Sequence, residues 1–189
     1  MTQHLNFNKL PRSFYEQHTI EVARRLLGCY LIHQTGEQQL IGKIVETEAY
    51  LGGPDLAAHS SKGMTKRTQI MFGPAGFAYV YLIYGIHHCL NVVTESPDIG
   101  SAVLIRALEP YTALDVSTKG PGLLCRAFGI TRALNGHDLL SSNFYIAQTN
   151  DNDCVNILSR PRIGIDYAGE WTPKLLRFYI KDNPFISKK

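Results

Sequence analysis

The stretch that decides the fold reads Ala78-Tyr-Val-Tyr-Leu-Ile-Tyr-Gly-Ile-His-His-Cys-Leu-Asn-Val-Val93. Two runs rich in aromatic and β-branched residues flank Tyr84-Gly85, a pattern that predicts a β-hairpin with its tip near this pair. Turns favour Gly, Asn and Asp, so a large ring at the tip is unusual. Alternation places Tyr79 and Tyr81 on one face of the first strand. For Tyr79 we favour a place in the core, whereas Tyr84 needs another explanation.

Short strands and few helices surround this hairpin in the sequence. The pattern predicts a helix that begins at a capping-box pair, Ser13 and Glu16, and ends at Gly28, and a second helix over residues 123–128. Further strands are predicted over residues 29–33, 40–45, 103–108, 144–147, 162–165 and 176–180. We therefore expect an α+β fold: a single compact domain over residues 1–189, with a largely antiparallel curved sheet, a few short helices and a protruding β-hairpin.

Composition limits the classes to which this chain can belong. Of its 189 residues, 44% are hydrophobic and 19% are charged, which suffices for a core and argues against disorder. No apolar run approaches the roughly 18–20 residues of a membrane-spanning helix. The first residues show no charged segment followed by an apolar one, so we expect no export signal and a cytoplasmic location. In that compartment the four cysteines, Cys29, Cys89, Cys125 and Cys154, would be free thiols.

Positive charge is concentrated in a few segments of a chain whose formal net charge is only +3. Residues 160–189 hold seven basic and three acidic residues. Two further clusters without acids are Lys62, Lys66 and Arg67, and Lys119, Arg126 and Arg132. Such clusters fit a nucleic-acid footprint. Charge alone nevertheless favours the plainer interpretation of a solvated face.

Residues 41–50 carry a possible acid–base pair. If this stretch is extended, residues 44, 46, 48 and 50 share one face, which bears Glu46, Glu48 and Tyr50. Carboxylates two positions apart on a strand are separated by ~6–7 Å, enough to hold a water between them as in a glycosidase. Strand geometry by itself favours the alternative, one structural and one solvated carboxylate.

Other residues are candidates for binding rather than for proton transfer. A ring held at the tip, as Tyr84 would be, can wedge between stacked bases. Asn91 and Arg106 lie in strand-like apolar stretches and need defined hydrogen-bond partners if they are buried. His87 and His88 point to opposite faces of a strand, which argues against a shared metal ion. We therefore expect no metal. No glycine-rich nucleotide motif occurs, so we expect no cofactor either.

Taken together, these segments resemble the methylpurine-DNA glycosylases, the alkyladenine (3-methyladenine) DNA glycosylase family. The matching stretches are Ile44-Val-Glu-Thr-Glu-Ala-Tyr-Leu-Gly52, Ala57-Ala-His-Ser60, Met71-Phe72, Tyr79-Val-Tyr-Leu-Ile-Tyr-Gly85, Asn91, Val103-Leu-Ile-Arg-Ala-Leu-Glu-Pro110, Gly120-Pro-Gly122, Ala168-Gly-Glu-Trp171 and Leu176-Arg-Phe-Tyr179. The resemblance implies a monofunctional, cofactor-free glycosylase that flips a damaged purine out of duplex DNA, hydrolyses its N-glycosidic bond and so starts base excision repair. Implied substrates are 3-methyladenine and 7-methylguanine, with hypoxanthine and ethenoadenine also open.

The resemblance also implies roles for single residues. Glu48 would be the general base that activates water, Arg106 and the main chain at Ile163 would help to hold that water, and Glu46 would have a supporting role. The base pocket would be lined by Tyr50, His59, Tyr81 and Asn91, of which Asn91 would screen purines by their exocyclic groups. Contacts to DNA would come from Tyr84, which fills the gap in the duplex, and from Met71, Thr65 and Arg67.

Three positions depart from the family's pattern. Thr68 stands where Asn is frequent, His88 where an aromatic ring is commoner, and Leu123 where Lys is frequent. The first and third bear on phosphate contacts, the second on hairpin support or lesion range, and none involves Glu48. The expected partner is double-stranded DNA that contains damaged purines, bound by a monomer. Two alternatives stay open: a non-catalytic nucleic-acid-binding module of the same fold, and a nucleosidase, against which the hairpin tip and the basic segments argue.

Overall fold

The long strand β3 (Gln38–Tyr50) is the centre of the architecture. The structure, a computed structural model, describes residues 6–150 and 155–189. In this part of the chain eight more strands join β3 in one sheet: β1 (Phe7–Lys9), β2 (Tyr30–Thr35), β4 (Ala78–Ile83), β5 (His87–Thr94), β6 (Ser101–Pro110), β7 (Phe144–Thr149), β8 (Ile157–Arg160) and β9 (Arg177–Ile180). The α-helices are α1 (Arg12–Tyr15), α2 (Thr19–Arg25) and α3 (Pro121–Ala127), and the short 3-10 helices are η1 (His59–Lys62), η2 (Gln69–Phe72), η3 (Arg132–Leu134) and η4 (Asp166–Trp171).

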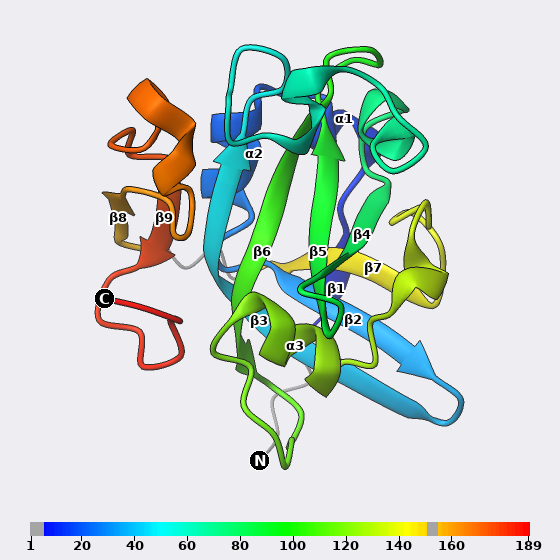
Figure 1. Cartoon of the computed structure of the whole chain (residues 1–189). Coiled ribbons are helices and arrows are strands. Elements are labelled where there is room, and N and C mark those ends of the chain that lie inside the picture. Colours follow the sequence, from blue (N-terminus) through cyan, green and yellow to red (C-terminus); the bar gives the residue numbers. More distant parts are fainter. Residues whose placement is uncertain (1–5, 151–154) are drawn as a thin grey trace.

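The sheet is antiparallel throughout and strongly curved. Its strand order is β1-β7-β2-β3-β6-β5-β4, with β9 paired to β3 and β8 to β9. The register of β3 against β6 shifts on both sides of Glu46, and such a bulge bends a strand and increases its twist. Figure 1 shows the result: β5 and β6 run upright, whereas β2 and β7 lie across them. The α+β prediction and its curved antiparallel sheet are confirmed.

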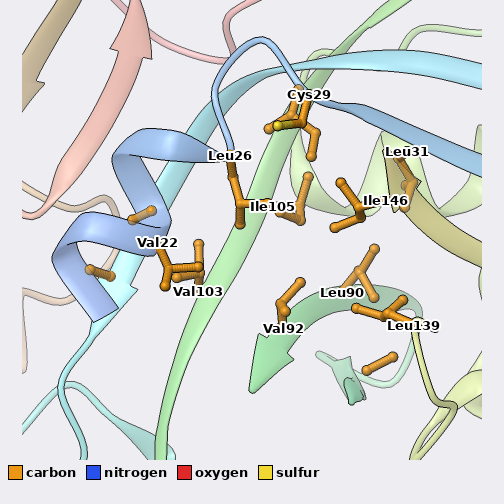
Figure 2. Close-up of a cluster of buried hydrophobic side chains, with 14 of the residues drawn as sticks. Val22, Leu26, Cys29, Leu31, Leu90, Val92, Val103, Ile105, Leu139 and Ile146 are labelled. Atoms are coloured by element: carbon orange, nitrogen blue, oxygen red, sulfur yellow. The ribbon is translucent and has the colours of Figure 1, made fainter. Parts of the chain in front are cut away.

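The main core lies between α2 and the inner face of the sheet. Figure 2 shows Val22 of α2, and Leu26 directly after that helix, pointing toward Val103 and Ile105 of β6. Further along the same cluster lie Leu31, Leu90, Val92, Leu139 and Ile146. Full burial of such a side chain stabilises the fold by roughly 1.5–3 kcal/mol. This packing fixes β3, β5 and β6, which carry Glu48, Asn91 and Arg106 of the site described below.

Two predicted features at the ends of the chain are wrong. The single helix predicted from Ser13 to Gly28 is two shorter helices, α1 and α2, and Ser13 lies inside α1 with no capping hydrogen bond. The following helix, α2, receives its cap from a distance, since Glu95 accepts from the backbone N–H of Thr19 at 2.9 Å. Residues 162–165 are not a strand either. The strand in this region is β8, and its partner β9 closes the sheet against β3.

The bulge in β3 corrects the predicted face of residue 44. Ile44 joins the main core together with Ala49, whereas Glu46 and Glu48 both contact Arg106 on the other face. The alternation from Glu46 onward is therefore as expected, and only the residue before the bulge changes side. Cys29, Cys89 and Cys125 are buried free thiols, and Cys154 lies outside the described residues. Among the described helices, none is long and apolar enough to cross a membrane.

Candidate active site

Three donors converge on the carboxylate of Glu48, which is fully buried in β3. The hydroxyl of Tyr50 donates to Oε2 at 2.9 Å, and the backbone N–H of Ile163 donates to Oε1 at 2.8 Å. The guanidinium of Arg106, on the neighbouring strand β6, approaches Oε1 at 3.3 Å. The strand pairing explains part of this convergence, because Glu48 and Leu104 are direct partners and Arg106 follows two positions later. The resemblance-based set Glu48, Tyr50, Arg106 and Ile163 is thus gathered at one point.

Glu46 does not form a water-separated pair with Glu48. Arg106 lies between the two carboxylates, with its Nε 3.4 Å from Oε1 of Glu46. Glu46 also accepts from Nη1 of Arg177 at 3.0 Å and from the backbone N–H of Ser187 at 2.6 Å. Burial opposes the charge on Arg106, but the Glu48 and Glu46 carboxylates raise the pKa of Arg106 above its usual value. The geometry therefore gives Glu46 a structural role in holding Arg106.

A cavity of about 130 Å³ opens beside Glu48, and the three groups that bind its carboxylate line it. Its walls are largely aromatic and apolar. They comprise Tyr50, Ala57, His59, Met71, Tyr79, Tyr81, Ile83, Cys89, Asn91, Ala102, Leu104, Arg106, Pro121, Ile163, Gly164, Ile165 and Tyr167. A small number of polar groups in an apolar concave site is typical of a ligand pocket. The predicted pocket residues Tyr50, His59, Tyr81 and Asn91 all lie in this wall.

One wall of the cavity is an aromatic cluster of His59, Tyr79 and Tyr81. The rings of His59 and Tyr81 meet edge to face with centroids 4.5 Å apart, and Nδ1 of His59 lies 3.1 Å from the hydroxyl of Tyr79. Burial, assisted by the nearby Arg67, lowers the pKa of His59 to about 4. Burial also favours the uncharged form of Tyr81, because it raises the pKa of its hydroxyl. At neutral pH this wall therefore presents uncharged rings.

Asn91 and Met71 complete the inner wall. The amide Nδ2 of Asn91 donates to the backbone carbonyl of Tyr79 at 3.1 Å, across the β4–β5 pair. This bond fixes the orientation of the amide at the cavity. Met71, which the resemblance places in contact with DNA, is only 3% exposed and packs with Tyr79. Its place is in the cavity wall rather than on the outer surface.

Tyr84 stands at the tip of the β4–β5 hairpin and is 86% exposed. Its φ is +53°, and Gly85 follows with φ +72°. A turn with two successive positive φ values suits the twist of a hairpin and normally holds Asn or Gly. A tyrosine in this conformation is strained, and strained residues cluster at functional sites.

The loop between η1 and η2 brings positive charge to the cavity. Buried Thr68 organises it, because its hydroxyl accepts from the backbone N–H of Thr65 at 2.9 Å and donates to the carbonyl of Gly63 at 3.2 Å. Thr65 and Arg67 are exposed, as contacts to DNA would require. The guanidinium of Arg67 lies 5.3 Å from the centroid of the Tyr81 ring. A groove of about 400 Å³ continues from there, lined by Lys66, Arg67, Arg132 and Asn135 among others.

The other two positions that depart from the family's pattern lie in β5 and α3, which pack against each other. His88 pairs with Leu82 in the hairpin and is half-buried, and Leu123 is half-buried in α3. In the described part of the chain, no three His, Cys, Asp or Glu side chains gather in a group that could hold a metal ion. His87 and His88 therefore have no third partner of that kind among the described residues.

Two residues of the cavity were missed as functional candidates. Tyr79 was expected only in the core. It is 2% exposed, yet it lines the cavity and bonds His59, and its alternation with Tyr81 is the signal that could have shown this. Tyr167 is 71% exposed and stands at the cavity's edge on η4. No local sequence pattern marks it, because the short helix η4 meets the cavity only through the tertiary fold.

Sequence comparison relates this chain to known proteins. Residues 13–184 match the family model described as methylpurine-DNA glycosylase (MPG). A relative from Legionella pneumophila (strain Corby), named "Putative 3-methyladenine DNA glycosylase", is 63% identical over 180 residues, which cover 95% of this chain and 98% of that protein. Relatives of the same name from Myxococcus xanthus (strain DK1622) and Methanocella arvoryzae (strain DSM 22066 / NBRC 105507 / MRE50) are 49% and 47% identical. They cover 96% and 95% of this chain, and 94% and 96% of their own lengths.

Proposed function

Because the chain belongs to the methylpurine-DNA glycosylase family, we propose that it removes alkylated or otherwise damaged purines from duplex DNA by hydrolysis of the N-glycosidic bond. 3-Methyladenine and 7-methylguanine are the proposed substrates, and hypoxanthine and ethenoadenine are the next to test. The observation that carries the proposal is the buried Glu48 carboxylate, held by three donors that themselves line an aromatic cavity.

Glu48 is the proposed general base. An ionised carboxylate offers about four acceptor sites, and the three donors around Glu48 leave room for one more. A water bound there would approach from the cavity, since Tyr50, Arg106 and Ile163 line it. As the bond to the base breaks, Glu48 would take a proton from this water while the water oxygen attacks the anomeric carbon. The carboxylate would also stabilise the oxocarbenium-like sugar.

The aromatic wall supports recognition of a cationic base. 3-Methyladenine and 7-methylguanine carry a positive charge in DNA, and each favourable ring face contributes roughly 0.5–2 kcal/mol of cation–π attraction. His59 is neutral at pH 7, because burial lowers its pKa to about 4, and so it does not repel such a base. The charged purine is already a good leaving group, so a single carboxylate suffices for release.

The surface around the cavity supports a duplex substrate rather than a free nucleoside. The exposed ring of Tyr84 is suited to fill the gap that a flipped nucleotide leaves, and Lys66, Arg67 and Arg132 are suited to bind phosphates. A nucleoside would use neither. We further propose that the protein acts as a cytoplasmic monomer.

Base release from alkylated duplex DNA tests the proposal directly. The wild-type protein, incubated with a methylated duplex, is expected to create abasic sites that alkali converts to strand breaks. Glu48→Gln keeps the shape of the side chain but cannot accept a proton, so it should bind the damaged duplex and release base at least about 100-fold more slowly. Glu109→Gln, which changes a carboxylate elsewhere on β6, is the matched control and should release base normally.

Two results would contradict the proposal. Binding without any release by the wild-type protein would favour the non-catalytic module. Near-normal turnover by Glu48→Gln would remove Glu48 from its role as base.

A further inference from the structure

A second buried ion pair lies behind the Glu48 site and contributes no side chain to the cavity lining. Arg162 and Asp55 form two bonds: Nη1 to Oδ2 at 2.5 Å and Nη2 to Oδ1 at 2.8 Å. Both side chains are 0% exposed. A buried pair with this forked geometry adds directional constraint as well as attraction. It is weak evidence for stability by itself, because desolvation of both charges offsets most of the attraction.

The pair contacts the structure on both sides of Glu48. Nη1 of Arg162 also donates to the backbone carbonyl of Ala49 at 2.8 Å, between Glu48 and Tyr50. The guanidinium carbon lies 4.6 Å from the centroid of the Tyr50 ring. The residue after Arg162 is Ile163, whose N–H bonds Glu48. One guanidinium therefore fixes two of the three donors to the Glu48 carboxylate.

Asp55 fixes this guanidinium in turn. Its carboxylate accepts from the backbone N–H groups of Leu51 and Ala57 at 3.0 and 3.1 Å. These bonds tie the segment after β3 to the start of the cavity wall, since Ala57 lines the cavity. The third donor to Glu48, Arg106, depends instead on Glu46. Glu48 is thus supported by two separate ion-pair systems.

We propose that Arg162, anchored by Asp55, is a positioning residue for Glu48: it holds the Tyr50 hydroxyl and the Ile163 N–H in the places from which they orient the carboxylate. This inference rests on the proposed function of Glu48. Loss of the two-bond contact between Arg162 and Asp55 would leave base binding intact and would slow the chemical step. Misplacement by about 1 Å can slow a reaction by roughly 100-fold even when the changed residue does not touch substrate.

Arg162→Lys and Asp55→Asn are the informative variants. Lysine keeps the positive charge, but its single ammonium group cannot bond the two carboxylate oxygens of Asp55 and the carbonyl oxygen of Ala49 with the planar geometry of a guanidinium. Asparagine keeps the shape of Asp55 without its charge. Arg162→Ala would leave a buried, unpaired carboxylate, which tests stability rather than position. The matched control is Asp138→Asn. Asp138 pairs with Arg12 at 2.8 Å, and that arginine also donates to a carbonyl, at Ala75.

Single-turnover base release with the variant in excess over the lesion duplex reports only on molecules that are folded and bound. We expect both variants to release base about 10- to 100-fold more slowly, with the dissociation constant of the lesion duplex within about threefold of wild type. Asp138→Asn should release base within about twofold of wild type. In the Glu48→Gln background, Arg162→Lys should change the residual rate by less than about twofold, because both substitutions remove the same function.

Three results would overturn the inference while the proposed function stood: unchanged release by Arg162→Lys and Asp55→Asn, a loss of affinity as large as the loss of rate, or a full additional loss in the Glu48→Gln background. If the wild-type protein released no base, the proposed function would fail and the inference would fail with it.

Discussion

Tyr50 donates its hydroxyl to the carboxylate of Glu48 from two residues further along the same strand, with the oxygens 2.9 Å apart. Burial is the main reason that the pKa of Tyr50 lies well above its usual value, and the Glu48 charge raises it further. The phenol therefore remains protonated, and a hydrogen-bond donor, at neutral pH. This pair links the side chain proposed as the base to a ring of the cavity wall.

Tyr50→Phe should separate these two roles. The ring stays in the wall, so binding of the lesion duplex should change little. A hydrogen bond to a charged group contributes about 1.5–3 kcal/mol, so we expect base release to slow by roughly 10- to 100-fold. Single-turnover release measures the effect, and Tyr145→Phe, on β7, is the control. A rate equal to wild type would mean that Tyr50 does not orient Glu48.

Tyr84→Gly should weaken DNA binding without loss of stability. Glycine removes a positive-φ strain of about 1–2 kcal/mol and adds about 0.5–1 kcal/mol of unfolded-state entropy. The free energy of unfolding, measured with urea, should therefore stay constant or rise by up to ~1.5 kcal/mol. Affinity for a lesion duplex should fall by roughly 5- to 100-fold, the equivalent of a lost aromatic–base contact, and affinity for a single-stranded lesion should not. Tyr84→Phe keeps the ring and should bind normally. Equal losses on both substrates would exclude a wedge.

Thr68→Ala should loosen the loop that carries Lys66 and Arg67. It removes the hydroxyl that links Thr65 to Gly63, and each lost hydrogen bond costs about 0.5–1.5 kcal/mol. We expect a lower melting temperature, and DNA binding whose dependence on salt is shallower because fewer phosphate contacts form. Thr68→Ser, which keeps the hydroxyl, is the control and should restore both. Unchanged DNA binding and salt dependence, with only a lower melting temperature, would limit Thr68 to a structural role.

His59 should make stability dependent on pH. Its pKa is about 4 in the folded protein and 6.5 ordinarily, chiefly because burial disfavours the imidazolium. The unfolded chain therefore binds a proton that the folded chain does not, so stability is lost as pH falls from about 6.5 toward 4. His59→Asn should show a smaller loss between pH 7 and 4.5 in urea titrations. His18→Asn changes an exposed side chain and should keep the wild-type loss. An identical pH dependence in both variants would contradict a neutral, buried His59.

Local pattern predicted the sheet well and the helix caps poorly. The β4–β5 hairpin and α3 follow from alternation, a turn pair and a closing glycine, all of which are local signals. The start of α2 does not, because its cap is the carboxylate of Glu95, 76 residues later. The bulge at Glu46 was also missed. It depends on how β3 meets β6, and no residue type within β3 marks it.

The site shows the same division between local and long-range signals. Alternation placed Glu46, Glu48 and Tyr50 on one face, but it could not tell which carboxylate is structural. That distinction comes from Arg177 and Ser187, which reach Glu46 from the end of the chain. Arg162 carried no signal as a member of the site, since its partner Asp55 lies 107 positions away. Resemblance to a family supplied the positions, and the contacts give their physical reasons.

The hydrogen bond from Ile163 to Glu48 spans 115 positions of the chain. A chain that ended before this segment would keep Tyr50 and Arg106 as donors to the carboxylate, but it would lose the third donor together with the Arg162 guanidinium that lies over the Tyr50 ring. The direction of the Glu48 carboxylate is therefore set jointly by segments far apart in the sequence, so the full set of donors forms only when the last third of the chain has folded onto β3.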